Sequence, residues 1–271
     1  MQGASRDTLA AVQEQLRRFA GASDPQTLAR VADEMFSVGE LIDGNPILRR
    51  LLTDPSSAAD AKAGLLSRLL SNKVGDETAS LLESAVRGGW GAPGDLSDAV
   101  DALGRESLLY SAEREGRLDT VEDELFRFGR VLAREPELQL LLSDRTRPTD
   151  RRIGLLAAVV GDKVSPQTKR LLEQATASSR GRGLEHVVGQ ISTMAAVRRD
   201  RLVAVATSVV PLTAEQHDRL VAALTRIYGR DVELRVEVEP DLLGGMVVKV
   251  GDEVIDGSVV HKLSVARRAL A

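Results

Sequence analysis

Side chains that could do chemistry are scattered along this chain and do not fall at the spacings that active sites use. The three histidines, His186, His217 and His261, are far apart, and none has the second histidine of a metal-binding H-x-x-x-H pattern. The chain has no cysteine, which excludes disulfides, thiolate metal ligands and cysteine nucleophiles. It also lacks a G-x-S-x-G nucleophile turn and a G-x-x-x-x-G-K-[ST] phosphate loop. We therefore expect no catalytic, metal-binding or cofactor-binding residues.

Charged clusters give two weaker signals. Glu237 and Glu239 fall on one face of a predicted strand, which indicates a solvated surface better than a general acid/base pair. Arginines gather at residues 145–152 and 198–201, and contact with RNA phosphates is one interpretation. Interleaved aspartates neutralise part of this charge, however, and aromatic residues for base stacking are absent there. A solvated face or an acidic protein partner is the favoured interpretation.

The composition is that of a soluble globular protein, with 43% apolar and 28% charged residues. Aromatic residues make up only 3%, so the core must be built from Leu, Val and Ala, which suit close-packed helices. No run of about 18 apolar residues occurs, and the polar N-terminus lacks the apolar core of a signal peptide. A cytoplasmic protein without a membrane span is expected, and its net charge of −4 gives no general attraction to nucleic acid.

The first two-thirds of the chain contain an internal repeat with a period of 90 residues. Between residues 31–91 and 121–181 about a third of the positions are identical without a gap, and the identities include Pro, Gly, Asp and Lys. A shared register of this kind indicates duplication. Each copy reads as a string of short amphipathic helices, and residues 95–114 can form one long helix that ends the first bundle and begins the second. Gly104 is a poor helix former within that segment.

The pattern changes after residue 201. Residues 202–209 are rich in β-branched side chains and predict a strand. Thr213 and Gln216 have the spacing of a capping box, so a helix is expected to begin there. Alternating valines and leucines at 232–238 predict a second strand, and residues 246–250 and 253–255 predict a hairpin around Gly251-Asp252. A last helix is expected near the C-terminus.

The predicted fold class is mainly α, with two tandem homologous helical bundles followed by a small α+β domain. The expected boundaries are 1–104 for the extra bundle, 105–200 for the second bundle and 201–271 for the α+β domain.

The ordered motifs of the last 70 residues resemble the delta subunits of F-type ATP synthases, the oligomycin-sensitivity-conferring protein family. They are Ser208–Thr213 with Gln216, then Leu243–Val248, then Val250–Ser258. Segment Ser107–Asp119 resembles the opening helix of the family's N-terminal domain, so residues from about 105 to 271 look like a complete delta subunit. The family-signature positions are Pro211, Thr213, Gln216, Gly244, Gly245, Gly251, Asp252, Asp256, Gly257 and Ser258. The first hundred residues depart from the usual pattern of one bundle.

The resemblance implies a non-catalytic stator subunit on the cytoplasmic face of the bacterial plasma membrane. The helical bundle would receive N-terminal helices of the α subunits, and the C-terminal domain would join b-type subunits of the peripheral stalk. By the family pattern, the groove for the α-subunit helix lies between the first and fifth bundle helices, here about residues 105–115 and 166–177. Leu109, Tyr110 and Lys169 are candidate groove residues, with a packing role as the alternative for Tyr110.

Two other functions remain open at this stage. A general helical adaptor unrelated to ATP synthesis would bind some other helical partner, and an RNA-binding protein would use the arginine clusters. Only the stator interpretation requires association with α and b-type subunits.

Overall fold

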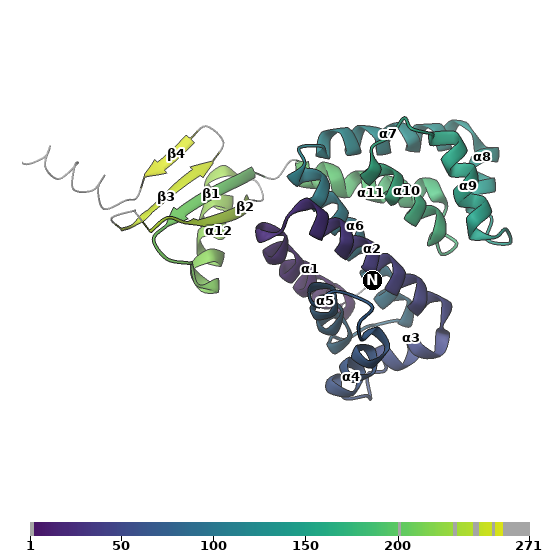
Figure 1. The fold of residues 1–271 in the computed structure, drawn as a ribbon, viewed down its shortest axis with the longest axis horizontal. Coiled ribbons are helices and arrows are strands. Elements are labelled where there is room, and N and C mark those ends of the chain that lie inside the picture. The colour runs from purple at the N-terminus through teal and green to yellow at the C-terminus, as the bar shows by residue number, and fades with distance from the viewer. Residues whose placement is uncertain (1–2, 200–201, 230–231, 241–243, 251–252, 257–271) are drawn as a thin grey trace, which may run out of the picture. The chain divides into compact units, whose positions relative to one another are not determined.

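The structure is a computed structural model that describes residues 3–199, 202–229, 232–240, 244–250 and 253–256. These residues contain twelve helices and one four-stranded sheet (Figure 1). The chain divides into two compact units, Met1–Ala196 and Val197–Ala271, which are called here the helical unit and the C-terminal unit. The predicted fold class, mainly α with a small α+β region at the C-terminus, is confirmed.

The helical unit contains eleven helices, the last of which continues to Arg199. In chain order they are α1 (Ala4–Ala22), α2 (Pro25–Gly44), α3 (Pro46–Thr53), α4 (Ala59–Leu70), α5 (Asp76–Arg87), α6 (Pro93–Arg114), α7 (Leu118–Arg134), α8 (Pro136–Ser143), α9 (Thr149–Val160), α10 (Pro166–Ala177) and α11 (Leu184–Arg199). The 90-residue period relates α2–α5 to α7–α10. Each copy is therefore a six-helix set, α1–α6 and α6–α11, and α6 belongs to both.

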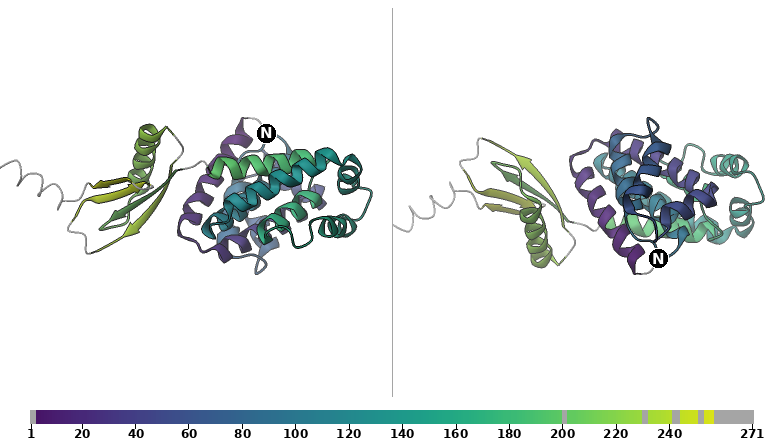
Figure 2. Two further views of the ribbon diagram at one scale, coloured as in Figure 1. Left: turned by 90° about the horizontal axis from the view of Figure 1, so that it is seen from above. Right: turned by 90° about the horizontal axis from the view of Figure 1, so that it is seen from below.

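Helix α6 is the long inter-copy helix that the sequence predicts, and it runs without a break through residue 104. Seen from above in Figure 2, the teal and green helices of the second copy lie in front, and seen from below, the dark blue helices of the first copy do. At a rise of about 1.5 Å per residue, α6 is about 33 Å long, enough to take part in both copies. The predicted boundary between the two bundles, at residues 104 and 105, falls within α6. It therefore stays a prediction of where one copy of the repeat ends and the next begins.

In both copies, a glutamate carboxylate accepts hydrogen bonds from the first residues of the fifth helix. The first amide groups of a helix lack intrahelical acceptors and need another partner. The carboxylate of Glu34, on α2, accepts hydrogen bonds from the Gly75 amide (3.1 Å) and the Thr78 hydroxyl at the start of α5. Glu124, on α7, accepts from the Ser165 amide (3.0 Å) and hydroxyl (2.8 Å) at the start of α10. The repeat therefore preserves polar contacts as well as apolar positions.

Two apolar cores form in the helical unit, and they exchange residues across the copy boundary. The first core is built by α1–α6, but it also includes Tyr110, from the end of α6 that opens the second copy. The second core is built by α6–α11, but it also includes Ala32 of α2, with Ala29 and Phe36 packed against it. Side chains of each copy are thus buried by the other.

Gly104 has a packing role. A Cβ atom at this position would lie 2.5 Å from Cε1 of Phe36 and 3.1 Å from Cβ of Met35, both on α2. Only glycine therefore lets α2 approach α6 this closely. Gly104, a poor helix former in the sequence, is therefore required for the contact between α2 and α6.

The C-terminal unit is a small mixed sheet with one helix against one of its faces (Figure 2). Its elements are β1 (Leu202–Ser208), α12 (Ala214–Tyr228), β2 (Val232–Val238), β3 (Met246–Val250) and β4 (Glu253–Asp256), in the sheet order β2-β1-β3-β4. Strand β1 pairs in parallel with β2 and antiparallel with β3. The parallel pair requires a crossover, which α12 provides. Ala204 and Ala206 of β1 are fully buried and pack in one core with Leu224 of α12.

A capping box and one glycine fix the two ends of α12. The Thr213 hydroxyl accepts from the Gln216 amide (3.2 Å) and the Gln216 side chain accepts from the Thr213 amide (2.9 Å), which is the predicted capping box. Gly229 ends the helix with φ of 64°, in the left-handed region that glycine adopts without strain. Helical periodicity places Ile227 on the same stripe as Leu220 and Leu224, but Ile227 is 67% exposed.

Replacing Thr213 with alanine is expected to destabilise the C-terminal unit by about 1 kcal/mol, because an amide of the first turn of α12 loses its acceptor. Urea unfolding monitored by a probe in this unit measures the change. Glu215→Ala, in the same exposed turn, is the control and should change stability by less than about 0.5 kcal/mol. Equal effects of the two variants would show that the cap contributes nothing.

Candidate partner-binding surface

Two of the three candidate groove residues are not on the surface. Leu109 and Tyr110 are each 1% exposed, and only Lys169, on α10, is partly accessible. Tyr110 packs in the core of the first copy, and Leu109 packs in the core of the second. Of the two interpretations of Tyr110, a groove contact and a packing residue, its burial supports the packing role. The physical reason is the first copy, which covers the face of α6 that a single bundle would leave open.

The arginine clusters are only partly solvated. Arg152 is 4% exposed, and its Nη1 donates to the carbonyl oxygens of Leu142 (3.4 Å) and Thr176. Lys62, at the equivalent position of the first copy, is 6% exposed and donates to the Gly88 carbonyl (3.4 Å). Both cations thus bind carbonyls at or just beyond the end of their fifth helix, where helical carbonyls lack partners. Arg198 is also buried, so the expectation of a solvated face is wrong for Arg152 and Arg198, whereas Arg145, Arg147 and Arg151 are exposed.

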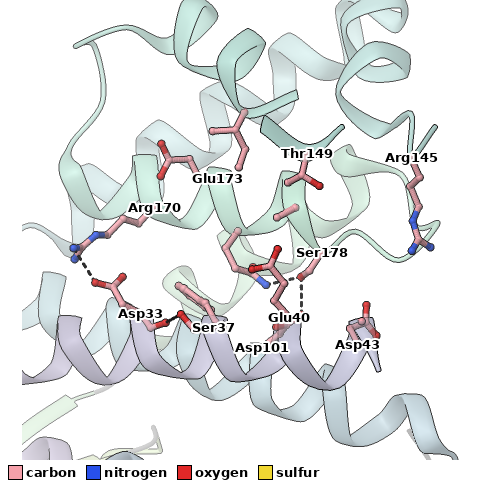
Figure 3. Close-up of a pocket in the computed structure, with 15 residues that line it drawn as sticks. Asp33, Ser37, Glu40, Asp43, Asp101, Arg145, Thr149, Arg170, Glu173 and Ser178 are labelled. Carbon is pink, nitrogen blue, oxygen red and sulfur yellow. Dashed lines mark hydrogen bonds and ion pairs between the residues drawn. The ribbon is translucent and has the colours of Figure 1, made fainter. Parts of the chain in front are cut away.

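A cleft of about 470 Å³ lies inside the helical unit, between α2 on one side and α9 and α10 on the other (Figure 3). Along α2, Asp33, Ser37, Glu40 and Asp43 follow one another at helical spacing and face the cleft. At one end, Nη2 of Arg170 on α10 lies 2.9 Å from the Asp33 carboxylate, which joins the first copy to the second.

The other end of the cleft is held by a buried network of charges. Arg180, in the loop between α10 and α11, contacts three carboxylates of the first-copy helices α2 and α6, namely those of Asp43 (3.0 Å), Asp98 (2.7 Å) and Asp101 (2.8 Å). The Ser178 hydroxyl donates to the Asp101 carboxylate at 2.7 Å. Arg180 has φ of 48°, which is uncommon for a residue with a side chain, and its ion pairs hold the loop in that conformation.

Burial and charge act against each other in this network. Burial raises the pKa of the Asp101 carboxyl, although Arg180 and Arg105 act in the opposite direction. Burial lowers the pKa of the Arg105 guanidinium to about 10, and its Nε donates to Gln174 of α10 at 2.7 Å. Burial alone would also lower the pKa of Arg180, but the three carboxylates raise it above its ordinary value. Opposite charges this close attract more strongly in a largely buried site than in water, and the network joins the loop after α10 to α2 and α6.

The C-terminal unit brings part of the family-signature set into defined geometry. Pro211 precedes α12, and Gly244 and Gly245 have φ of 120° and 85° before β3, so both need glycine. Asp256 pairs with Val247 at the end of β4. Gly251, Asp252, Gly257 and Ser258 lie outside the described residues, as does the predicted last helix. Val250 pairs with Glu253 across the expected turn.

Among the residues that the structure describes, no group of three or more His, Asp or Glu side chains is placed to hold a metal ion. His186 is exposed and His217 is partly buried beside Asp218, and His261 lies outside the described residues. No helix in the described part of the chain is both long and apolar enough to cross a bilayer.

Fold and surface together define the class of protein: a tandem helical repeat whose copies share a helix and are locked by buried charges, with a small mixed-sheet unit attached. The model of the family described as ATP synthase delta (OSCP) subunit matches residues 106–270, which are the second copy and the C-terminal unit. The chain belongs to this ATP synthase delta (OSCP) subunit family.

Relatives extend the match to the first copy. The ATP synthase subunit delta of Streptomyces griseus is 43% identical over 271 residues, which is 100% of both chains. That of Streptomyces avermitilis is 44% identical over 269 residues, 99% of this chain and 98% of the relative. That of a Parafrankia species is 40% identical over 278 aligned positions, 100% and 99% of the two chains. These alignments include the extra bundle, which is therefore not peculiar to this sequence.

Proposed function

We propose that this chain is the non-catalytic stator subunit that couples the catalytic head of an F-type ATP synthase to its peripheral stalk. The proposal rests on the family match over residues 106–270, and relatives named ATP synthase subunit delta that align along their whole length support it. The role requires a protein that holds two partners against a twisting load, and the locked helical copies suit it. The chain would act peripherally, on the cytoplasmic face of a bacterial plasma membrane.

The two units would divide the binding. The helical unit would hold N-terminal helices of α subunits, since amphipathic helices bind to helical platforms through apolar anchors at i, i+3, i+4 and i+7. The C-terminal unit would bind b-type subunits of the peripheral stalk. The division of the chain into two compact units at residues 196 and 197 is consistent with two separate attachments.

Reconstitution tests this function. The purified chain alone should hydrolyse no ATP, and adding it to membranes stripped of their own delta subunit should restore proton-driven ATP synthesis. A chain ending at residue 199 should still bind the head but fail to restore synthesis, because the stalk attachment is missing. Loss of head binding alone, with stalk binding intact, would reverse the assignment of the two units. Failure of the full chain to bind either the head or the stalk would contradict the stator function.

A further inference from the structure

The helix that should form one wall of the second copy's groove has no open face. Helix α6 is buried at every position from Leu103 to Ala112, and this includes polar residues such as Ser107 and Ser111. By contrast, α1 is the first helix of the first copy and exposes Ala10, Ala11 and Arg18. A partner helix could therefore not lie on α6 unless something moved away.

Helix α2 covers this wall. Ala32 is fully buried in the core of the second copy, and Ala29 and Phe36 pack against that core. Asp33, on the same face, forms the ion pair with Arg170 of α10, so α2 packs on one wall of the groove and is joined to the other at one end of the cleft between α2 and α10. The N-terminal end of α2 is fixed as well, because the Ser111 hydroxyl of α6 donates to the Pro25 carbonyl at 2.8 Å.

The four α2 residues have the spacing of a helix that is held in a groove. Positions 29, 32, 33 and 36 are i, i+3, i+4 and i+7, the spacing by which a groove recognises one face of a helix. Three of these positions are apolar, and the fourth, Asp33, forms the ion pair with Arg170. Ala29 and Ala32 are small, which allows a close approach to α6.

The repeat supplies an internal comparison. The residues of α7 equivalent to Ala29 and Ala32 are Asp119 and Glu122, and the equivalent of Phe36 is Phe126, which is 57% exposed. At the equivalent positions, α2 therefore has two small apolar residues where it meets the second copy, whereas α7 has two charged residues and an exposed phenylalanine.

We propose that α2 occupies the groove between α6 and α10 within the chain, so that the second copy holds an internal helix and does not receive one from another subunit. The inference deepens the proposed function, and it rests on that function only for the identity of the excluded helix. In the intact chain, partner helices of the head must therefore bind at other faces of the helical unit.

Site-specific cross-linking tests this, because the chain has no native cysteine. In the full-length Asp33→Cys/Arg170→Cys variant, a short bismaleimide would lock α2 to α10. The probe is a fluorescent peptide of the α-subunit N-terminal helix, and its Kd is measured by anisotropy for the wild type, both single variants and the double variant with and without cross-link. The proposal predicts the same Kd within about twofold. A loss of about tenfold or more on cross-linking alone would overturn it, since the peptide would then need α2 to move.

A second measurement decides the proposal without the peptide. Ser111→Cys in the full-length chain should react with a thiol reagent at least about 100-fold more slowly than Ser80→Cys, which lies on the exposed side of α5. Equal reactivity would show that α2 leaves the groove readily and would overturn the proposal. If no form of the protein binds the peptide while Ser111→Cys stays protected, the inference stands and the proposed capture of α-subunit helices fails.

Discussion

The Ala32→Glu variant is expected to lose about 4 kcal/mol of the free energy of unfolding of the helical unit. Ala32 is fully buried in the core of the second copy, so a carboxylate there would be removed from water into apolar surroundings. Urea unfolding of the full-length chain measures the loss, provided that the slope of the transition is unchanged. Because Ala32 lies on α2, the variant should also release the first copy from the second and increase the labelling of Ser111→Cys.

The repeat provides the matched control. Glu122, the equivalent residue of α7, is only partly buried, so Glu122→Ala exchanges the same two residue types in the opposite direction. We expect it to change stability by less than about 0.5 kcal/mol. Ala32→Leu tests packing alone and should cost about 1 to 3 kcal/mol through overfilling of the core. An Ala32→Glu protein as stable as the wild type would show that α2 does not contact the second copy in solution.

Replacing Arg180 with alanine is expected to cost about 3 kcal/mol at pH 8, because it leaves the buried carboxylate of Asp101 without its closest cation. Arg182 is the control. Of the three aspartates that Arg180 contacts, it pairs with Asp98, and its side chain is 34% exposed, so Arg182→Ala should cost less than about 1 kcal/mol. Guanidinium-induced unfolding of the two variants separates a buried network from a surface ion pair.

The pH dependence of the Arg180→Ala protein follows from the direction of the Asp101 shift. Burial already raises the pKa of this carboxyl, and loss of Arg180 raises it further, so the folded state binds a proton that the unfolded state releases above about pH 4. The free energy of unfolding of the variant therefore falls as the pH rises from about 4 through the raised pKa of Asp101 in the folded state. The loss of stability relative to the wild type should be clearly smaller at pH 5 than at pH 8. Adding Asp101→Asn should recover part of the loss at pH 8. A deficit independent of pH and unaffected by Asp101→Asn would place the effect elsewhere.

The elements of this fold were largely predictable from the sequence, because their signals are local. Pro136 and Pro166 open α8 and α10, the pair Thr213 and Gln216 caps α12, and alternating apolar residues define β2. Residues 95–114 contain no strong helix breaker, and this predicted the shared helix as well. Such signals depend on residues within a few positions of one another, and the capping and periodicity rules describe them directly.

The burial of Tyr110 was not predictable by the same means, because it depends on contact between residues about 80 positions apart in the sequence. The helical pattern of α6 shows apolar residues on more than one side, but not which neighbour covers each side. One signal was available: where the first copy has Ala29 and Ala32, the second has Asp119 and Glu122. This change from small apolar to charged residues, seen when the two copies are aligned, indicates that the outer face of α2 is an interface. The role of Arg180 had no such signal, since a loop arginine gives no pattern.

Because α6 belongs to both copies, it determines how further copies of the repeat could be added to such a chain. Two six-helix bundles are built here from eleven helices, so a further copy would add five helices and not six, and it would have to begin on an existing terminal helix. The joint between neighbouring copies is then an uninterrupted ladder of backbone hydrogen bonds instead of a linker. A twisting force applied to one copy passes to the next along that rod, and there is no loop between them in which the motion could be absorbed.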